Sequence, residues 1–393
     1  MKEPAEFDHV RFPEAVETIA AEAPAPAFVI DLDGLRRNLA ILASVKERAS
    51  CRILLAQKGF SAFQTYSIIA EYLDGACASS PHEARLAREY LNKEVHAYAP
   101  AWRETEVTEM LPMIDHLLFN SVGQLRRFGH LANAARRQID LGLRVNPEHR
   151  EGSVDLYDPC ASGSRLGVLA EELEAGDLEP ISGLHFHTLC EADAGALVRT
   201  LAAFEARFGQ YLPALAWVNF GGGHHITRAG YDRDLLVTTI ANFRQKHGVE
   251  VYLEPGEAVA LNAGVLVCSV LDIVHPEDPV AILDISATAH MPDVLEMPYR
   301  PTLLGGGQAR EKPHTYRLGG LTCLAGDVIG TYSFDRPLKI GDRLVFGDMG
   351  HYTMVKTTTF NGVPLPSICH YSEAEGLQVR RVFGYQDFKS RLG

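Results

Sequence analysis

Lys58 is the residue of this chain with the clearest capacity for covalent chemistry. It closes an apolar run, Arg52 to Lys58, and is followed at once by Gly59. Apolar runs of this length are typical of parallel strands covered on both faces. An amine held at the end of such a strand can lose its proton and act as a nucleophile. The alternative interpretation is a lysine that extends its ammonium group into solvent.

Polar side chains also follow several other apolar runs, and three successive glycines follow one of them. Glycines let backbone N–H groups turn inward and bind a phosphate, which a β-carbon would obstruct. An amine, a stacking ring, an anion-binding loop and a carboxylate are together the groups needed to hold pyridoxal 5′-phosphate. Without the other groups, the histidines would be interpreted as core residues, and Glu254 as a carboxylate that caps a loop amide. The residues after these runs are Arg144, Asn146, His185, His187, Gly221, Gly222, Gly223, His224, His225, Glu254, Gly256 and Glu257.

Eight apolar runs separated by stretches with helix signals must position these side chains. Eight strands alternating with helices over roughly 200 to 250 residues predict a (β/α)₈ barrel, in which chemistry sits at the carboxyl ends of the strands. The runs are residues 53–56, 75–78, 95–99, 116–119, 141–145, 183–186, 217–220 and 249–253.

After residue 261 the regular alternation of apolar runs and helix signals ends. Runs at 265–274, 280–285, 328–334 and 343–346 are joined by Gly, Pro and Asp turns with few helix signals. We therefore predict an α/β chain with two domains: a barrel over residues 25–262, and a mostly β domain made of residues 263–393 with an N-terminal arm, residues 1–24. Residues 27–31 are expected to form a strand entering the barrel region.

Composition excludes several classes of protein. The net charge of −13 argues against a nucleic-acid partner, although many proteins are acidic for solubility alone. No stretch approaches the ~20 apolar residues of a membrane span, and the first residues lack signal-peptide features. Seven scattered cysteines, none in a Cys-x-x-Cys pair, predict reduced thiols and no structural metal site. We expect a cytoplasmic protein.

Seven motifs, in order and over nearly the whole chain, resemble those of the alanine-racemase-fold, pyridoxal-phosphate-dependent decarboxylases. Within that family the chain is similar to the branch acting on the carboxylated triamines carboxynorspermidine and carboxyspermidine. The motifs lie at 55–60 (LAQKGF), 183–188 (GLHFHT), 221–223 (GGG), 254–257 (EPGE), 290–299 (HMPDVLEMPY), 323–327 (CLAGD) and 350–353 (GHYT).

The resemblance implies a role for each cofactor-binding residue. Lys58 would bind pyridoxal phosphate covalently, and His187 would stack on its ring, beside Arg144. Glu254 would face the pyridine nitrogen and keep it protonated, which favours decarboxylation. Racemases of this fold place an arginine there instead. The phosphate would be bound by Gly221, Gly222, Gly223 and Gly256, with help from Tyr352.

The resemblance also predicts which side chains bind the substrate. Diaminopimelate decarboxylases place an arginine about where this chain has Glu296. Asp293 and Glu296 are instead suited to the ammonium groups of a carboxylated triamine, and Glu257 is a further candidate. Solvation, or an ion pair that stabilises the fold, is the alternative for Asp293 and Glu296.

The motif at 323–327 implies a homodimer in which a cysteine and an aspartate reach the neighbouring subunit's active site. Cys323 would protonate the carbanion left after CO₂ loss, and Asp327 would contact a substrate amine. Otherwise the cysteine is a small hydrophobe and the Gly-Asp pair a turn. Two rival classes remain: a decarboxylase of diaminopimelate, arginine or ornithine, and a non-catalytic relative that only binds the cofactor.

Overall fold

The computed structural model describes residues 9–151, 158–174 and 176–393, so part of the predicted N-terminal arm lies outside the described residues. The chain forms two compact units. One spans Asn38–Val259, and the other combines Met1–Arg37 with Ala260–Gly393. The boundaries thus fall at 37/38 and 259/260, compared with the predicted 25–262.

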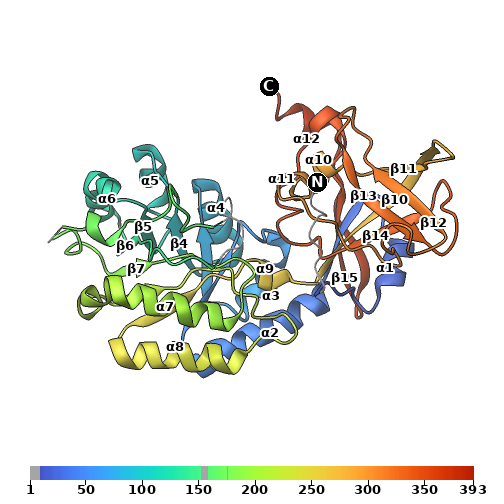
Figure 1. Ribbon diagram of the computed structural model, residues 1–393. Coiled ribbons are helices and arrows are strands. Elements are labelled where there is room, and N and C mark those ends of the chain that lie inside the picture. The colour runs from blue at the N-terminus through green and yellow to red at the C-terminus, as the bar shows by residue number, and fades with distance from the viewer. Residues whose placement is uncertain (1–8, 152–157, 175) are drawn as a thin grey trace. The chain divides into compact units, whose positions relative to one another are not determined.

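The first unit is the predicted (β/α)₈ barrel (Figure 1). Within the described residues eight parallel strands pair in chain order, and the last pairs with the first, which closes the barrel. The strands are β2 (Arg52–Ala56), β3 (Gly75–Ala78), β4 (Glu94–Tyr98), β5 (His116–Phe119), β6 (Asp140–Arg144), β7 (Gly183–His185), β8 (Trp217–Asn219) and β9 (Glu250–Leu253).

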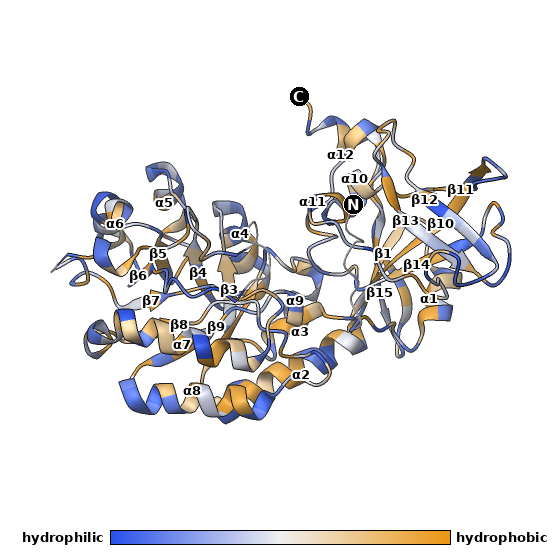
Figure 2. Ribbon diagram, in the orientation of Figure 1, coloured by the Kyte–Doolittle hydropathy of each residue, from blue (hydrophilic) through white to orange (hydrophobic). Residues whose placement is uncertain are grey.

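Helices surround these strands because each connection between parallel strands must cross back over the outside of the barrel. Figure 2 shows hydrophobic and hydrophilic residues alternating around α2, α7 and α8, as expected of helices with one face on the barrel and one in solvent. The helices are α2 (Leu32–Ala49), which begins in the other unit, α3 (Tyr66–Ala70), α4 (Pro81–Leu86), α5 (Glu104–Met110), α6 (Val122–Phe128), α7 (Ala194–Phe208), α8 (Arg233–His247) and α9 (Glu257–Ala260).

The indole ring of Trp217 fills the barrel interior and requires glycines on the two strands before its own. A β-carbon built on Gly183 of β7 would lie 2.1 Å from the Trp217 ring, and one on Gly142 of β6 would lie 2.5 Å from it. Trp217 packs with Leu54, Leu118 and Tyr252 in one buried cluster. Packing against this ring therefore requires glycine at both strand positions.

The second unit is the predicted mostly β domain, but it also contains the strand assigned to the barrel region. β1 pairs antiparallel with β10 and parallel with β15. Its five residues are all buried, and a run buried on both faces occurs equally in a barrel and in the middle of a covered sheet. The strands are β1 (Ala27–Asp31), β10 (Gly264–Val274), β11 (Val280–Leu283), β12 (His314–Gly319), β13 (Val328–Phe334), β14 (Arg343–Gly347), β15 (Ser367–Ser372) and β16 (Gly376–Arg381).

Short helices complete this unit. Residues of α1 pack against the sheet in a core that includes Val29, Val267 and Val345. None of the helices in the described ranges has both the length and the apolar character that crossing a membrane would need. The helices are α1 (Val16–Glu22), α10 (Ala287–His290), α11 (Asp293–Glu296) and α12 (Tyr385–Lys389).

Replacing Gly183 with alanine should destabilise the barrel, because the new methyl group would overlap the Trp217 ring. Overpacking of this kind costs about 1–3 kcal/mol of the free energy of unfolding. Urea unfolding followed by tryptophan fluorescence and circular dichroism measures the loss. Gly209→Ala is the matched control, since a β-carbon there meets nothing within 4 Å. Equal stability of the Gly183 and Gly209 variants would contradict the packing argument.

Candidate active site

Lys58 lies two residues beyond β2, at the carboxyl end of the barrel, and its side chain keeps access to solvent. Protein atoms nevertheless crowd it, and this desolvation lowers the pKa of the Lys58 amine. The positive charge of Arg144 lowers this pKa further, whereas Glu254 opposes the shift. The amine therefore becomes a neutral nucleophile more readily than an ordinary lysine.

Gln57 fixes the segment that carries Lys58. Its buried side-chain amide donates to the carbonyl oxygens of Cys77, at 3.1 Å, and Glu83, at 3.0 Å. The Tyr66 hydroxyl donates to Gln57 Oε1 at 3.0 Å. Since all three bonds are internal, the chain leaves β2 in a defined direction.

Glu254 follows β9, and three neighbours hold its carboxylate. Asn219 Nδ2 donates to Glu254 Oε1 at 2.6 Å, and His185 Nε2 lies 3.5 Å from Oε2. Burial opposes ionisation, but His185 and a hydrogen bond from the Cys77 thiol outweigh it and hold the pKa of Glu254 well below its usual value. Burial lowers the pKa of His185, and the Glu254 carboxylate opposes this shift.

His187 has a defined tautomer. The backbone N–H of Gly222 donates to His187 Nδ1 at 2.8 Å, so the ring proton is assigned to Nε2. Burial, Lys58 and Arg144 lower the pKa of His187 well below its ordinary value. The ring is therefore neutral, as a stacking partner for a cationic heterocycle should be.

The glycine loop makes close backbone contacts with the segments that follow β7 and β9. A β-carbon on Gly222 would lie 2.2 Å from the Glu254 carbonyl oxygen, and one on Gly223 would lie 1.9 Å from the Leu189 carbonyl oxygen. The N–H of Gly221 donates to Asn219 Oδ1 at 2.9 Å. Two loop N–H groups, those of Gly221 and Gly222, are thus engaged within the chain. Phosphate binding by this loop stays a prediction.

Arg144 ends β6 and is buried. Its guanidinium donates to the Tyr98 hydroxyl at 2.9 Å and to the His187 carbonyl oxygen at 3.0 Å, and it lies 4.9 Å from the centre of the Tyr98 ring. These contacts fix a positive charge among the residues of the barrel mouth. The place of Arg144 beside a cofactor ring stays a prediction.

Glu257, predicted to bind substrate, is in contact with a histidine of the barrel. His225 Nε2 lies 3.1 Å from Glu257 Oε2. His225 is buried, whereas Glu257 keeps part of its surface exposed. A substrate ammonium group would therefore meet a carboxylate that already has a partner.

Cys323 and Asp327 lie in the second unit. Cys323 is exposed, and its N–H donates to Asn361 Oδ1 at 2.9 Å. Asp327 is buried and accepts bonds from the N–H of Ala287, at 2.7 Å, and from the Thr322 hydroxyl, at 2.6 Å. Asp327 thus holds its own loop against α10, and its contact with a substrate amine stays a prediction.

Asp293 and Glu296, at the two ends of α11, flank one lysine. Lys356 Nζ is hydrogen-bonded to Asp293 and lies 3.8 Å from Glu296 Oε2. The ion-pair alternative is therefore realised, although Glu296 is largely exposed and Asp293 is not. Tyr352, expected to assist phosphate binding, lies in the same unit with a positive φ of 40°.

The structure brings Lys58, Arg144, His187 and Glu254 into mutual electrostatic contact at one barrel mouth. Sequence reasoning missed the positioning residues Asn219, Gln57 and Cys77. Asn219 is the last residue of β8, two residues before the glycine loop, just as Arg144 and His185 are the last residues of their strands. That position is the signal that could have identified it.

Comparison with known proteins decides the family. Residues 27–350 match the profile described as "Pyridoxal-dependent decarboxylase, C-terminal sheet domain". The chain belongs to this family of pyridoxal-dependent decarboxylases.

Two similar proteins cover nearly all of the chain. The chain is 45% identical to a carboxynorspermidine/carboxyspermidine decarboxylase of Campylobacter jejuni, over 93% of this chain and 98% of that one. It is 47% identical to a carboxyaminopropylagmatine decarboxylase of Synechocystis, over 94% of this chain and 96% of that one.

Solved structures agree with the fold. A Campylobacter jejuni carboxynorspermidine decarboxylase complexed with norspermidine superimposes with a TM-score of 0.87, at 44% identity, covering 93% of this chain and 99% of that one. A Helicobacter pylori diaminopimelate decarboxylase complexed with L-lysine has a TM-score of 0.78 at 17% identity, covering 96% and 98%, and thus shares the fold.

Asn219→Ala should cost about 1–3 kcal/mol of the free energy of unfolding, because it leaves the buried N–H of Gly221 without its partner and removes one of the three neighbours of the Glu254 carboxylate. Asn219→Asp keeps the shape but places a second carboxylate against Glu254. This repulsion raises the pKa of the introduced carboxyl, so the loss is present at high pH and shrinks as the group is protonated.

Urea unfolding at about pH 8 and about pH 5 separates the two variants. We expect the deficit of Asn219→Asp to shrink on acidification and that of Asn219→Ala to change little. An Asn219→Asp protein as stable as the parent at both pH values would refute the assigned contact.

Proposed function

We propose that this chain decarboxylates carboxynorspermidine or carboxyspermidine, with bound pyridoxal phosphate, to give norspermidine or spermidine. One observation carries the proposal. Lys58, His187 and Glu254 converge at one barrel mouth, in a chain 45% identical over almost its whole length to a protein named for this activity. The family match alone supports only the coarser statement of a pyridoxal-dependent decarboxylase.

The residues of the mouth fit the cofactor by their donor chemistry. Lys58 offers an amine whose pKa is lowered, as a covalent bond to an aldehyde requires, and Glu254 offers a lasting negative charge for a protonated ring nitrogen. His187 offers a neutral ring with a fixed tautomer. Bound pyridoxal phosphate would supply the electron sink that accepts the charge left by CO₂. Arg144 holds the segment of His187 in place through its carbonyl oxygen.

The proton that replaces CO₂ needs a donor. We assign this role to Cys323, whose exposed thiol would act in the active site of a partner subunit, with Asp327 shaping its loop. A homodimer with shared sites is therefore part of the proposal. All seven cysteines are free, which favours a reducing, cytoplasmic location.

Asp293, Glu296 and Glu257 are the candidate partners for substrate ammonium groups. A substrate cation would compete with Lys356 for Asp293 and Glu296, and with His225 for Glu257. Such exchange of one cation for another conserves charge pairing. An anionic distal group, as in diaminopimelate, would instead meet like charge.

Carboxyaminopropylagmatine is the second candidate substrate, and the 47% identity to the Synechocystis protein favours it. Its distal end carries a guanidinium group in place of an ammonium group. A carboxylate accepts two parallel hydrogen bonds from a guanidinium, so the same acids suit either substrate. The two candidate substrates therefore require distal pockets of different length and width.

The deciding experiment measures CO₂ release by the protein loaded with pyridoxal phosphate. The compounds offered in parallel are carboxynorspermidine, carboxyspermidine, carboxyaminopropylagmatine, meso-diaminopimelate, arginine and ornithine. We expect turnover of the first two and loss of all turnover in Lys58→Ala. Preference for carboxyaminopropylagmatine would select the second candidate, and turnover of diaminopimelate would refute the role of the acids. Bound cofactor without turnover of any compound would indicate a non-catalytic relative.

Shared active sites predict complementation between inactive chains. Lys58→Ala and Cys323→Ala each remove one half of the same site. Random mixing of the two should therefore restore about a quarter of the parent activity, because half of the dimers contain one intact site of two. Activity is measured after mixing under mild denaturation and refolding, with each variant refolded alone as the control. No recovery, from variants that form mixed dimers, would show that each site is built within one chain.

A further inference from the structure

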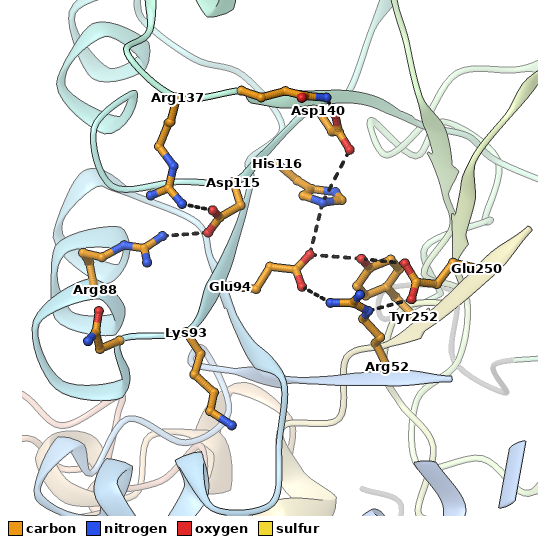
Figure 3. Close-up of a pocket in the computed structure, with 12 residues that line it drawn as sticks. Arg52, Arg88, Lys93, Glu94, Asp115, His116, Arg137, Asp140, Glu250 and Tyr252 are labelled. Carbon is orange, nitrogen blue, oxygen red and sulfur yellow. Dashed lines mark hydrogen bonds and ion pairs between the residues drawn. The ribbon is translucent and has the colours of Figure 1, made fainter. Parts of the chain in front are cut away.

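Glu254 can be compared with a second glutamate of the barrel, Glu94, which has different partners. Glu94 is the first residue of β4 and lies in the wall of a pocket of about 580 Å³ at the amino ends of the strands (Figure 3). The exposed fraction of the side chain is 15% for Glu94 and 11% for Glu254. Both carboxylates are therefore largely removed from water, and a buried anion needs positive charge or hydrogen-bond donors nearby.

Glu94 is held by a permanent cation. Arg52 Nη1 donates to Glu94 Oε2 at 3.0 Å, and Figure 3 shows this pair beside Tyr252, whose hydroxyl donates to Glu94 Oε1 at 3.0 Å. His96 Nε2 and His116 Nε2 also approach this Oε1 atom, at 2.8 Å and 3.1 Å. Because arginine stays protonated in proteins, the charge of Glu94 is compensated within the chain and needs no bound group.

Glu254 has no such cation. In the part of the chain that the structure describes, no arginine or lysine forms an ion pair with it, and the one such contact is with His185, whose Nε2 lies 3.5 Å from Glu254 Oε2. Asn219 and Cys77 are its other partners, and both are neutral donors. A carboxylate offers about four acceptor positions, so these three neighbours leave room for one further donor, such as the ring N–H of the proposed cofactor.

Strand register places His185 beside this acid. His185 is the last residue of β7 and pairs with Arg144 of β6 on one side and with Asn219 of β8 on the other. Residues paired in register on neighbouring strands present their side chains to the same face of the sheet. Asn219 therefore reaches Glu254 Oε1 while His185 approaches Oε2, and one contact on each oxygen fixes the plane of the carboxylate.

Stability does not account for a histidine at position 185. Both ring nitrogens of His185 are buried without a hydrogen bond to any described residue, so the contact with Glu254 is the polar contact of the ring in that part of the chain. An imidazole buried in this way costs free energy that an apolar side chain of similar size would not cost. A residue type that costs stability at the carboxyl end of a barrel strand indicates a functional role.

A histidine differs from an arginine beside Glu254 because its charge can be given up. Burial lowers the pKa of His185, Glu254 opposes this shift, and Arg144 and Lys58 lower the pKa further. The ring can therefore present an N–H to the carboxylate without a fixed positive charge, which would repel a protonated ring nitrogen of the cofactor. An arginine, like the one that holds Glu94, would keep that charge.

We propose that His185 is a positioning residue, which keeps Glu254 anionic and oriented so that this acid holds the ring nitrogen of the cofactor protonated. The inference rests on the proposed function, because it takes pyridoxal phosphate as the bound group and Glu254 as the partner of its ring nitrogen. Loss of His185 then lowers kcat more than it changes KM, since the electron sink weakens while the substrate-binding side chains stay in place.

The test is ¹⁵N nuclear magnetic resonance of the protein loaded with pyridoxal phosphate labelled at the ring nitrogen, which reports protonation without turnover. Glu254→Gln marks the resonance of a nitrogen that has lost its acid. We expect His185→Leu to move the resonance toward that value and to lower kcat by about 10- to 100-fold with little change in KM, since a contact to a charged group is lost. His185→Gln, which keeps an N–H near the position of Nε2, should stay close to the parent.

His116→Leu is the matched control. It removes a buried histidine from the other glutamate, Glu94, which keeps its arginine, and it should change neither the resonance nor kcat. A His116→Leu protein whose resonance moves as far as that of His185→Leu would show a general effect of losing a buried histidine and would overturn the proposal.

Failure of the inference and failure of the proposed function give different results. A resonance that moves in Glu254→Gln but stays at the parent position in folded His185→Leu would overturn the role of His185 alone. A resonance unmoved in Glu254→Gln would overturn the assigned partner of the ring nitrogen as well. If His185→Leu does not fold, ¹⁵N-histidine labelling of the parent decides, with His185 assigned from the spectrum of His185→Gln. Its Nε2 should carry a proton in the loaded protein, and an unprotonated Nε2 would overturn the proposal.

Discussion

Closure of the barrel between β2 and β9 is the constraint on which the candidate site depends. The first and last strands of the barrel pair directly, and the N–H of Ala56 continues the contact by donating to the Pro255 carbonyl oxygen at 3.0 Å. Beyond the strands, Gly59 and Gly256 meet backbone to backbone, where a β-carbon on Gly59 would lie 3.1 Å from the Gly256 Cα. The pairing of β2 with β9 brings Lys58, which lies near the start of the unit, beside Glu254, which lies near its end.

The charges at the mouth act as one system. Arg144 and the surrounding protein lower the pKa of the Lys58 amine, while Glu254 resists that change and itself remains anionic. Burial lowers the pKa of His187 well below its ordinary value, and the positive charges of Arg144 and of Lys58, while it is protonated, lower it further. The site therefore brings an amine of lowered pKa, a neutral ring and an anionic carboxylate together within a few side chains, as nucleophilic catalysis with a bound heterocycle requires.

Much of this arrangement could be predicted from the sequence because its signals are local. Apolar runs marked the barrel strands to within one residue at every end, and the polar residues at or just after the ends of the runs include most of the side chains that meet at the barrel mouth. β1 was assigned to the barrel region because a fully buried strand has the same apolar sequence pattern in a barrel as in the middle of a covered sheet. β12, β15 and β16 were missed; in β16 the last four residues are exposed and two are arginines, so the apolar run is short.

Partnerships between side chains distant in the sequence could not be predicted at all. The acid at Glu296 indicated a cation-binding role, but the sequence gives no sign that Lys356, sixty residues further on, lies between it and Asp293.

The two contacts of the Asn219 side chain constrain how proteins of this fold can change their reaction. Its amide joins the acid at the last barrel strand to the first residue of the glycine loop, with one atom facing each. An arginine at position 254, the arrangement expected in racemases of this fold, would turn that acceptor into a donor. The amide of Asn219 would then have to rotate and release the N–H of Gly221. A change of reaction type in this family is therefore epistatic: a substitution at residue 254 requires a compensating substitution at residue 219, because one amide serves both the acid and the glycine loop.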